Sequence, residues 1–426
     1  MTKSSEKSFA RQRQSEIFLG NLRGQSRSIP VAFDKLRTEA KKCLTEEAFA
    51  YIAGSAGQES TKRGNREGFG NWKIVPRMLR DVSSPETGIS LFGHHYPTPF
   101  LLAPIGVLEM AHPQADLAVS KAAASENIPF IFSSQASISM EKCSTAMNNA
   151  PKWFQLYWST NNELVDSFVR RAENCGCEGI ILTLDTTMLG WRPRDLDLDY
   201  LPFLRGMGIA QYTSDPVFKK MMQTPIAESD ESPKLTLNAL KALIQMAQNY
   251  PGSFWSNLLS DKPRRAVKTF IDCYSRPSLT WDDLSFLRSL TDLPIILKGI
   301  MAPEDARKAI EYEADGIVVS NHGGRQVDGA LSTIEALTEI TDEVNGEIPV
   351  LLDSGIRSGG DIFKALALGA DAVLLGRPYV YALAVAGEQG VKELIQNYRA
   401  DFELTMGLSG CRSIDEISPQ QLRNAQ

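Results

Sequence analysis

The chain has 426 residues, of which 43% are hydrophobic and 23% are charged, and its formal net charge is -6. This composition is ordinary for a soluble globular protein and argues against bulk disorder. The lack of a basic excess argues against nucleic acid as a partner. No apolar run approaches the ~20 residues that a membrane-spanning helix needs, so we expect no contact with a membrane. We expect the partner to be a small molecule.

The beginning of the chain carries no recognisable targeting signal. Its first residues are polar, no apolar run of signal-peptide length follows them, and Glu6 and Glu16 argue against a transit peptide. The six cysteines are scattered, and the one close pair, Cys175 and Cys177, is too tightly spaced for a CxxC metal or redox motif. We therefore expect reduced thiols, no metal and a cytoplasmic enzyme.

Eight short apolar segments, rich in Ile, Val and Leu, recur along the chain, and each leads toward a segment of helical character. They are residues 99–106, 129–134, 152–157, 179–185, 294–300, 316–321, 349–355 and 372–378. Continuous apolar character is typical of strands that are covered on both faces of a parallel sheet. Eight such strands alternating with helices predict an α/β fold, the (β/α)8 TIM barrel.

The intervening segments fit this pattern except in one place. Residues 303–314 and 361–370 have helical spacing, the second ending at Gly369. Between the fourth and fifth strands, however, lie more than a hundred residues where a short loop and a helix would suffice. We predict a long lid insertion at about 195–280, with a helix around 235–250. The remaining organisation is a polar N-terminal arm, residues 1–30, and one barrel domain, residues 31–426.

Polar residues concentrate where the predicted strands end. In a barrel of this type the carboxyl ends of all strands meet at one face, where active sites are found. Charged and amide groups are seldom buried without partners, so their convergence predicts a polar ligand. These residues are Gln155, Tyr157, Thr183, Asp185, Lys298, Ser320, Asn321, His322, Asp353, Arg357, Gly376 and Arg377.

The most informative stretch runs from Ser320 to Gly329 and reads SNHGGRQVDG. His322 offers a base near neutral pH, the glycines allow close approach of the backbone, and Arg325 can hold a carboxylate through paired hydrogen bonds. The alternative is a turn with a structurally satisfied histidine. Because only four histidines occur and this one lies between a strand end and a Gly-Gly-Arg turn, the functional interpretation is favoured.

Two further stretches add candidate groups. Asp185 could orient His322, although it could also cap a helix, and Arg192 supplies a second guanidinium group. The seventh and eighth strands end in DSGIR and GRP, where barrels often bind phosphate through glycine amides and nearby arginines. Tyr51 cannot be placed by periodicity, and a position in the core is its alternative.

Together these motifs resemble the FMN-dependent enzymes that oxidise L-2-hydroxy acids, a family that includes glycolate oxidases, lactate oxidases, lactate monooxygenases and mandelate dehydrogenases. SNHGGRQ is highly specific to the family, and APIG, FQLY, LTLD, LKGI and GRP accompany it in the family's order. DTTMLGWRPRDLD, PFLRG, DPVFKK and DSGIRSGGD, together with the long insertion, are most similar to the lactate 2-monooxygenase branch.

The resemblance implies roles for individual residues. His322 would take the substrate proton, Asp185 would stabilise its protonated form, and Tyr157 would bond the hydroxyl group. Tyr51, Arg192 and Arg325 would hold the carboxylate. Residues implied to bind FMN are Pro104, Ile105, Gly106, Ser133, Gln155, Thr183, Lys298, Ser320, Asp353, Gly355, Arg357, Gly376 and Arg377. Gln135 departs from the aromatic or apolar residue of many relatives, at a position that should border the substrate's variable group.

The resemblance also implies a reaction and its partners. A small L-2-hydroxy acid is oxidised with oxygen as acceptor, and the lid would keep the 2-oxoacid in place for oxidative decarboxylation. A simple oxidase that releases the 2-oxoacid and hydrogen peroxide is the alternative, and a non-redox flavin barrel isomerase is a further one. A barrel kept only for binding, without catalysis, would have lost the base His322 or the carboxylate-binding pair Arg192 and Arg325, and all three residues are present. We expect no haem domain, no membrane anchor and a homotetramer or larger assembly.

Overall fold

The computed structural model describes residues 8–24, 27–223 and 236–425. Eight parallel strands form a closed barrel in the order β10-β11-β4-β5-β6-β7-β8-β9. They are β4 (Phe100–Leu102), β5 (Phe130–Phe132), β6 (Lys152–Leu156), β7 (Ile180–Thr183), β8 (Ile295–Ile300), β9 (Gly316–Val319), β10 (Val350–Leu352) and β11 (Ala372–Leu375). Each lies in one of the eight predicted segments, so the (β/α)8 barrel is confirmed.

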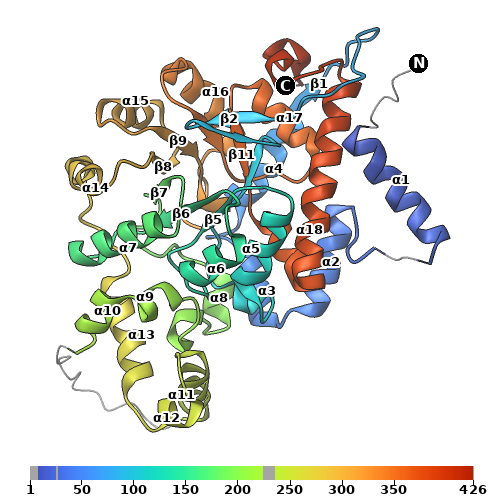
Figure 1. Ribbon diagram of the computed structural model, residues 1–426. Helices are drawn as coiled ribbons and strands as arrows, with labels where there is room; N and C mark the ends of the chain where they lie inside the picture. Colours follow the sequence, from blue (N-terminus) through green and yellow to red (C-terminus); the bar gives the residue numbers. More distant parts are fainter. Residues whose placement is uncertain (1–7, 25–26, 224–235, 426) are drawn as a thin grey trace.

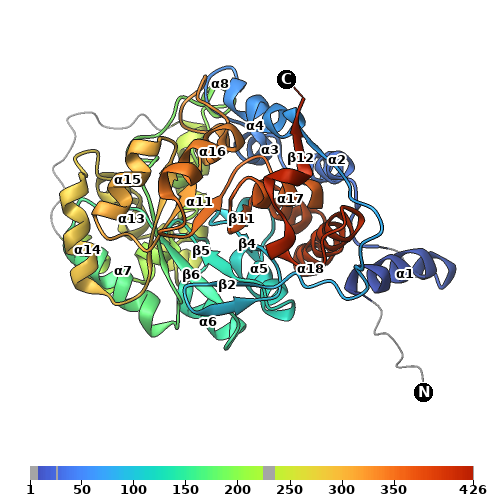
Figure 2. The same cartoon turned by 90° about the horizontal axis from the view of Figure 1, so that it is seen from above.

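Helices surround the barrel, as the view along its axis shows (Figure 2). They are α5 (Ala115–Ser125), α6 (Met140–Met147), α7 (Asn162–Asn174), α14 (Leu284–Leu290), α15 (Pro303–Glu311), α16 (Thr333–Val344), α17 (Gly359–Ala367) and α18 (Arg377–Leu408). The helices predicted at 303–314 and 361–370 are confirmed as α15 and α17. Helix α18 is interrupted at Ala386 and Gly387, where the backbone is not helical.

Alternate strand residues divide the apolar side chains between two cores. Leu101 and Ile131 belong to the cluster inside the barrel, whereas Phe100 and Phe130 belong to the larger cluster between the strands and the helices. This division follows because successive side chains of a strand point to opposite faces. The apolar strand segments are continuous in sequence because both faces are buried.

The amino end of the barrel is closed by a hairpin of β2 (Ile89–Leu91) and β3 (His94–Tyr96). Leu91 and Tyr96 belong to the cluster inside the barrel, and Trp153 Nε1 donates to the Tyr96 hydroxyl at 3.2 Å. With this end closed, the carboxyl end is the one through which a ligand can enter.

The insertion after β7 lies at the opposite end from this hairpin, in the lower part of Figure 1. Its helices are α8 (Pro193–Asp197), α9 (Ala210–Ser214), α10 (Pro216–Met221), α11 (Leu237–Asn249), α12 (Phe254–Leu258) and α13 (Lys262–Cys273), with a short 3-10 helix, η2 (Pro202–Arg205). Helix α11 confirms the helix predicted around 235–250. Residues 224–235, within the predicted insertion, lie outside the described residues.

The segments before and after the barrel complete the fold. The predicted polar arm contains a helix, α1 (Phe9–Leu22), whose Ala10 amide donates to Glu403 of α18 at 3.1 Å. It is followed by α2 (Phe33–Cys43), α3 (Glu46–Ala53) and α4 (Ser60–Asn71), and β1 (Trp72–Ile74) pairs with β12 (Leu422–Asn424) near the end of the chain. The remaining 3-10 helices are η1 (Leu108–Met110), η3 (Trp281–Asp283), η4 (His322–Gly324), η5 (Ile414–Glu416) and η6 (Pro419–Gln421).

The expectations of reduced cysteines and of no membrane-spanning helix agree with the structure as far as it is described. All six cysteines are free thiols. In the described part of the chain, no helix is both long enough and apolar enough to span a membrane.

Candidate active site

A cavity opens at the carboxyl end of the barrel. Most of the residues singled out in the sequence line it, although they come from every part of the barrel. Those in the wall are Tyr51, Pro104, Ile105, Gly106, Gln135, Gln155, Tyr157, Thr183, Arg192, Lys298, His322, Arg325, Asp353, Gly355, Arg357, Gly376 and Arg377. Tyr51, which lies on α3, is therefore a wall residue rather than part of the core.

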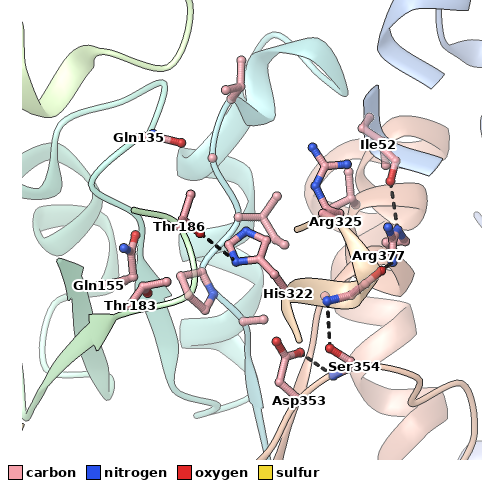
Figure 3. A pocket seen from close by; sticks show the side chains of 18 of the residues that line it. Ile52, Gln135, Gln155, Thr183, Thr186, His322, Arg325, Asp353, Ser354 and Arg377 are labelled. Atoms are coloured by element: carbon pink, nitrogen blue, oxygen red, sulfur yellow. Dashed lines mark hydrogen bonds between the residues drawn. The ribbon is translucent and has the colours of Figure 1, made fainter. Parts of the chain in front are cut away.

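His322 and Asp185 form a pair at the ends of β9 and β7. His322 Nδ1 lies 2.8 Å from Asp185 Oδ1, and the Thr186 hydroxyl lies 3.2 Å from the same nitrogen. Figure 3 shows the contact between Thr186 and His322. The second ring nitrogen of His322 is left to face the cavity. The alternative in which Asp185 caps a helix is wrong, because α8 begins only at Pro193.

Backbone geometry brings the pair together. Strand β8 has a register shift between Lys298 and Ile300, and a Cβ atom on the intervening Gly299 would lie 2.9 Å from the Asp185 Cβ. His322 itself has a φ of 57°, a left-handed conformation that is uncommon for residues other than glycine and is often found at functional sites.

The charges of this pair are set by burial and by neighbouring groups. Burial lowers the pKa of His322 below its ordinary value, and the attraction of Asp185 offsets this only in part. Burial acts to raise the pKa of Asp185, but His322, which is protonated at the acidic pH where a carboxyl group titrates, and Lys298 outweigh it and lower that pKa to about 2. The pair therefore consists of a neutral imidazole and a carboxylate at physiological pH.

Arg192 and Arg325 lie side by side in the same wall. Arg192 Nε donates to the Arg325 carbonyl oxygen at 3.0 Å, and its Nη2 donates to Gln326 Oε1 at 2.9 Å. The Arg325 guanidinium lies 4.7 Å from the centre of the Tyr51 ring and donates to the Tyr51 carbonyl oxygen. Burial and the charge of Arg325 lower the pKa of Arg192 to about 10. Neither arginine forms an ion pair with a carboxylate among the described residues, although Asp195 is close enough to attract both. Two such crowded cations favour a bound anion.

Lys298 is held in the floor of the cavity. Its Nζ lies 3.1 Å from Asp353 Oδ2 and 2.8 Å from the Ser320 hydroxyl oxygen, and that hydroxyl donates to Asp353 Oδ2 at 2.8 Å. Burial acts to lower the pKa of Lys298, but the charges of Asp353 and Asp185 raise it overall. Lys298 is thus a fixed positive charge in the floor of the cavity, one that can stabilise a developing anion.

Two polar atoms identify a ligand-binding face at the ends of β6 and β7. Gln155 Nε2 and Thr183 Oγ1 are buried, and neither has a hydrogen-bond partner among the described residues. Gln155 Oε1 already accepts from the Ser134 amide at 3.2 Å, which leaves the Nε2 donor available. Buried polar groups are normally paired, so these atoms fit a planar, polar ligand such as a flavin ring. Figure 3 shows them across the cavity from Arg325 and Arg377.

The opposite end of the cavity suits a phosphate. Arg377 donates to the backbone oxygens of Ile52, Gly54 and Gly323, and burial together with the charge of Arg325 lowers its pKa to about 9. Gly376 is the N-cap of α18, where backbone amides favour an anion. Arg357 also lines this end and donates to the neighbouring Ile356 oxygen. Both arginines also line a second cavity, on the side of α2 and α4.

The structure shows why residue 355 is a glycine, which the sequence alone did not explain. Its φ is +90°, and a Cβ atom there would lie 2.5 Å from the Asn65 carbonyl oxygen of α4. Only glycine therefore allows α4 to pack against the end of β10.

Three predicted site residues lie behind the wall rather than in it, namely Asp185, Ser133 and Ser320. Their contacts make them positioning residues: Asp185 holds His322, the Ser133 hydroxyl donates to Gln155 Oε1 at 3.3 Å, and Ser320 holds Lys298. A sequence motif shows which residues occur together but not which of them contacts the ligand.

Sequence reasoning assigned no role to several wall residues. These are Ile52, Ala103, Val107, Leu108, Thr186, Leu189, Phe203, Tyr274, Ser354, Ile356, Leu374 and Val380. Thr186 stands next to Asp185, and this adjacency was the one available signal for it. Phe203 lies in PFLRG, which resembles the lactate 2-monooxygenase branch, but the resemblance gave it no role. Tyr274 lies outside every quoted motif, and aromatic residues are usual in cores, so the sequence did not mark it.

This arrangement can carry out proton abstraction coupled to a redox reaction on an anionic substrate. One cavity holds a neutral base, two cations for a carboxylate, a buried lysine and a phosphate-binding end. No cluster of three or more His, Cys, Asp or Glu side chains able to hold a metal ion occurs within residues 8–24, 27–223 and 236–425.

Similarity to known proteins agrees with this site. The model of a family described as FMN-dependent dehydrogenase matches residues 40–424. The L-lactate oxidase of Lysinibacillus sphaericus is 40% identical over 402 residues, which are 94% of this chain and 95% of that protein. The 4-hydroxymandelate oxidase of Amycolatopsis orientalis is 36% identical over 386 residues, which are 90% of this chain and 96% of that protein.

Solved structures give the same result for the fold. A mandelate oxidase of known crystal structure is 35% identical and superimposes with a TM-score of 0.73, covering 92% of this chain and 98% of that chain. The similarity extends over nearly the whole chain.

Proposed function

The chain belongs to the FMN-dependent dehydrogenase family, with FMN as its cofactor, and on that premise we propose that it oxidises a small, lactate-like L-2-hydroxy acid with oxygen as acceptor. Oxidation of 2-hydroxy acids is the activity named in its relatives, the L-lactate and 4-hydroxymandelate oxidases. The L-isomer, the side chain of the substrate and the final product are what we propose for this chain in particular.

One observation carries the proposal: a neutral His322, held by an ionised Asp185, shares a cavity with Arg192 and Arg325. The two guanidinium groups and Tyr51 would bind the substrate carboxylate, as paired donors do in other carboxylate sites. A carboxylate held there presents its hydroxyl-bearing carbon to His322, with the Tyr157 hydroxyl nearby in the same wall.

His322 would accept the substrate proton on the ring nitrogen that faces the cavity. Asp185 would stabilise the imidazolium that forms, because its carboxylate lies 2.8 Å from the other ring nitrogen. Burial raises the pKa of Tyr157, so this side chain stays a neutral hydrogen-bond donor.

FMN, when bound, supplies the acceptor for the two electrons that leave the substrate. Gln155 and Thr183, whose free polar atoms face the cavity, would bond its ring, and Lys298 would stabilise negative charge there. Pro104, Ile105 and Gly106 would pack against it, with Ser133 and Ser320 as supports. Asp353, Gly355, Arg357, Gly376 and Arg377 would hold the ribityl chain and phosphate.

We further propose that the 2-oxoacid stays in the cavity and is decarboxylated by the hydrogen peroxide formed from oxygen. The overall reaction converts a 2-hydroxy acid and O2 into the acid shorter by one carbon, CO2 and water. The insertion supports this proposal because two of its residues, Phe203 and Tyr274, line the cavity, and a segment that closes over a site can exclude water and hold a product.

A simple oxidase is the second candidate, favoured by the relatives named above, all of which are oxidases. It would release the 2-oxoacid and hydrogen peroxide in equal amounts. The same relatives argue against a non-redox isomerase.

Anaerobic mixing tests the proposal. The FMN-loaded protein is mixed with L-lactate, glycolate, L-mandelate and longer L-2-hydroxy acids, and flavin absorbance is followed before air is admitted. We expect bleaching by at least one L-isomer and then a decarboxylated acid. Equal amounts of peroxide and free 2-oxoacid would establish the simple oxidase, and no bleaching by any member would contradict the proposed function.

The cytoplasmic location and the homotetramer expected from the sequence stay predictions. Size-exclusion chromatography with light scattering tests the second, since a tetramer has four times the 47.0 kDa of one chain.

A further inference from the structure

One side of the cavity is built by the insertion and not by the barrel motifs. Leu189 precedes α8, Phe203 lies in η2, and Tyr274 follows α13, yet all three line the cavity. The rings of Phe203 and Tyr274 are stacked, with their centres 6.5 Å apart and their planes 26° apart. This wall is therefore apolar and largely aromatic.

The wall is attached directly to the loop that follows β5. The Ala210 amide donates to the Ala136 oxygen at 3.1 Å, and Gln211 Nε2 donates to the Ser133 oxygen at 3.3 Å. Gln211 Oε1 also accepts from the Met140 amide at 3.0 Å. These bonds fix the insertion at the edge of the cavity, so its aromatic side chains have defined positions.

Gly208 marks the point where the two parts meet. A Cβ atom there would lie 2.6 Å from Val107 Cγ2, 3.0 Å from the Gln135 oxygen and 3.2 Å from Phe203 Cε1. Phe203 and Gln135 are therefore neighbours across this glycine. Any side chain at residue 208 would collide with them, which shows how closely the wall is packed.

Gln135 is the polar group at this end of the cavity. Its side chain is largely buried and lines the cavity, but its amide makes no hydrogen bond within the described ranges. Figure 3 shows Gln135 on the side of Thr186, away from Arg377, Asp353 and Ser354. The side-chain amide thus lies at the end of the cavity away from the phosphate-binding arginines, where a Cβ atom on Gly106 would be 3.5 Å from Gln135 Oε1.

We propose that this wall is a subsite for the substrate's variable group, and that it selects L-2-hydroxy acids with an aromatic side chain that ends in a hydrogen-bonding group. This inference rests on the proposed function and leaves its chemistry unchanged, but it changes the preferred substrate from one with the small side chain of lactate to one with an aryl side chain. Phe203, Tyr274 and Leu189 would pack against the ring, and the Gln135 amide would bond its polar substituent.

Two physical arguments favour this class over a methyl side chain. An aromatic group gains stabilisation both from burial and from stacking on other rings, whereas a methyl group would leave most of the apolar wall without contacts. A site with a buried polar group also discriminates against ligands that cannot bond it, because the group is then left unpaired.

The test compares four substrates with FMN-loaded protein: L-lactate, L-2-hydroxyisocaproate, L-3-phenyllactate and L-3-(4-hydroxyphenyl)lactate. The rate of anaerobic flavin reduction at several concentrations gives kcat/KM for each. We expect both aryl substrates to exceed L-lactate by about 10-fold or more, the scale of discrimination by one or two apolar groups. The ring-hydroxylated substrate should be the best of the four.

Variants locate the preference in the wall. Phe203→Leu and Tyr274→Leu keep apolar volume but remove the rings, and each should lower the aryl-to-lactate ratio of kcat/KM by about 10-fold. Gln135→Met should remove the preference for the hydroxylated over the plain aryl substrate. Leu204→Ala is the matched control, since Leu204 is the next residue in η2 and is 49% exposed.

The outcomes separate the two proposals. Reduction by L-lactate with a kcat/KM equal to or above that of the aryl substrates would overturn the subsite while supporting the proposed function. Wall variants whose substrate ratios match those of Leu204→Ala would also overturn it. Flavin that none of the four substrates reduces would overturn the proposed function itself.

Discussion

At the scale of single residues, the position of His322 sets the pH range of the reaction. The pKa of His322 lies below its ordinary value of 6.5 because its surroundings are buried, so the imidazole is already neutral at pH 6.5. The protonated form cannot accept the substrate proton. The rate of flavin reduction should therefore fall as the pH drops through the pKa of His322, with a midpoint below pH 6.5.

Removing the charge of Asp185 should impair this step without disturbing the cavity wall. We expect Asp185→Asn to lower kcat/KM by about 10²–10⁴-fold, the usual contribution of acid–base catalysis, because the imidazolium of His322 would lose its counter-charge. Stopped-flow absorbance measures the rate, and the flavin spectrum confirms that FMN is retained. A variant reduced at the parental rate would show that the pair is not the proton acceptor.

The phosphate-binding end can be tested through cofactor affinity. Arg357 donates to its neighbour Ile356 and stacks on the Phe33 ring at 4.6 Å, whereas Arg377 holds three backbone oxygens. Arg357→Gln is therefore the cleaner change. We expect it to weaken FMN binding by about 10–100-fold, as for the loss of one hydrogen bond to a charged group.

Riboflavin provides the control for that experiment because it lacks the phosphate. Flavin fluorescence measures both affinities, and the affinity for riboflavin should change little in the same variant. An equal loss for both flavins would place Arg357 away from the phosphate.

At the scale of elements, the insertion is joined to the barrel by a cluster of aromatic rings. Phe168 of α7 packs on Tyr212 at 5.1 Å, Tyr212 on Phe270 at 4.8 Å, and Phe270 on Tyr274 at 5.1 Å. Each such pair adds about 0.5–1.5 kcal/mol beyond its buried area. The cavity wall built by the insertion is therefore a packed layer whose position depends on α7.

A buried carboxyl group, that of Glu109, lies where the insertion meets the barrel at Gly208. Glu109 Oε1 accepts from the Gly208 amide at 2.9 Å. Burial, with a contribution from Asp116, raises the pKa of Glu109 from 4.5 to about 7. A raised carboxyl pKa makes the folded state lose stability as the pH rises from 4.5 to about 7, because the unfolded chain ionises first. Above about pH 7 the full decrease in the free energy of unfolding is present.

Glu109→Gln should remove this loss. We expect the variant to exceed the parent in free energy of unfolding by about 1–3 kcal/mol at pH 8, and the difference to shrink as the pH falls toward 4.5. Urea unfolding at several pH values measures it. Glu339→Gln, on the exposed side of α16, is the matched control. A constant difference across the pH range would contradict the assignment.

At the scale of the whole molecule, ligand binding and stability are coupled. The cavity is lined by residues of α3, of the insertion and of the ends of all eight strands, so FMN bound there would contact segments far apart in the chain. We expect FMN at 100 times its Kd to stabilise the protein by about 2.7 kcal/mol. Differential scanning fluorimetry with increasing FMN measures the shift. A Tm that does not depend on FMN would contradict binding in this cavity.

Much of the architecture could be predicted from local pattern. The eight apolar segments gave eight strands because a parallel strand buried on both faces needs an unbroken apolar run. The motif SNHGGR indicated His322 and Arg325, and both line the cavity. Ser133 and Ser320 show the limit of this reasoning, because they share motifs with wall residues but lie behind the wall.

Local sequence patterns were enough to predict the barrel and FMN as the cofactor, and they indicated the residues proposed to react, because these residues are adjacent in the chain or lie at strand ends. The residues that shape the far wall could be identified only from long-range contacts. Phe203, Tyr274 and Gln135 meet there through contacts between the insertion and the β5 loop. No local spacing encodes such long-range packing, since an aromatic residue of the core and one facing a cavity obey the same periodicity.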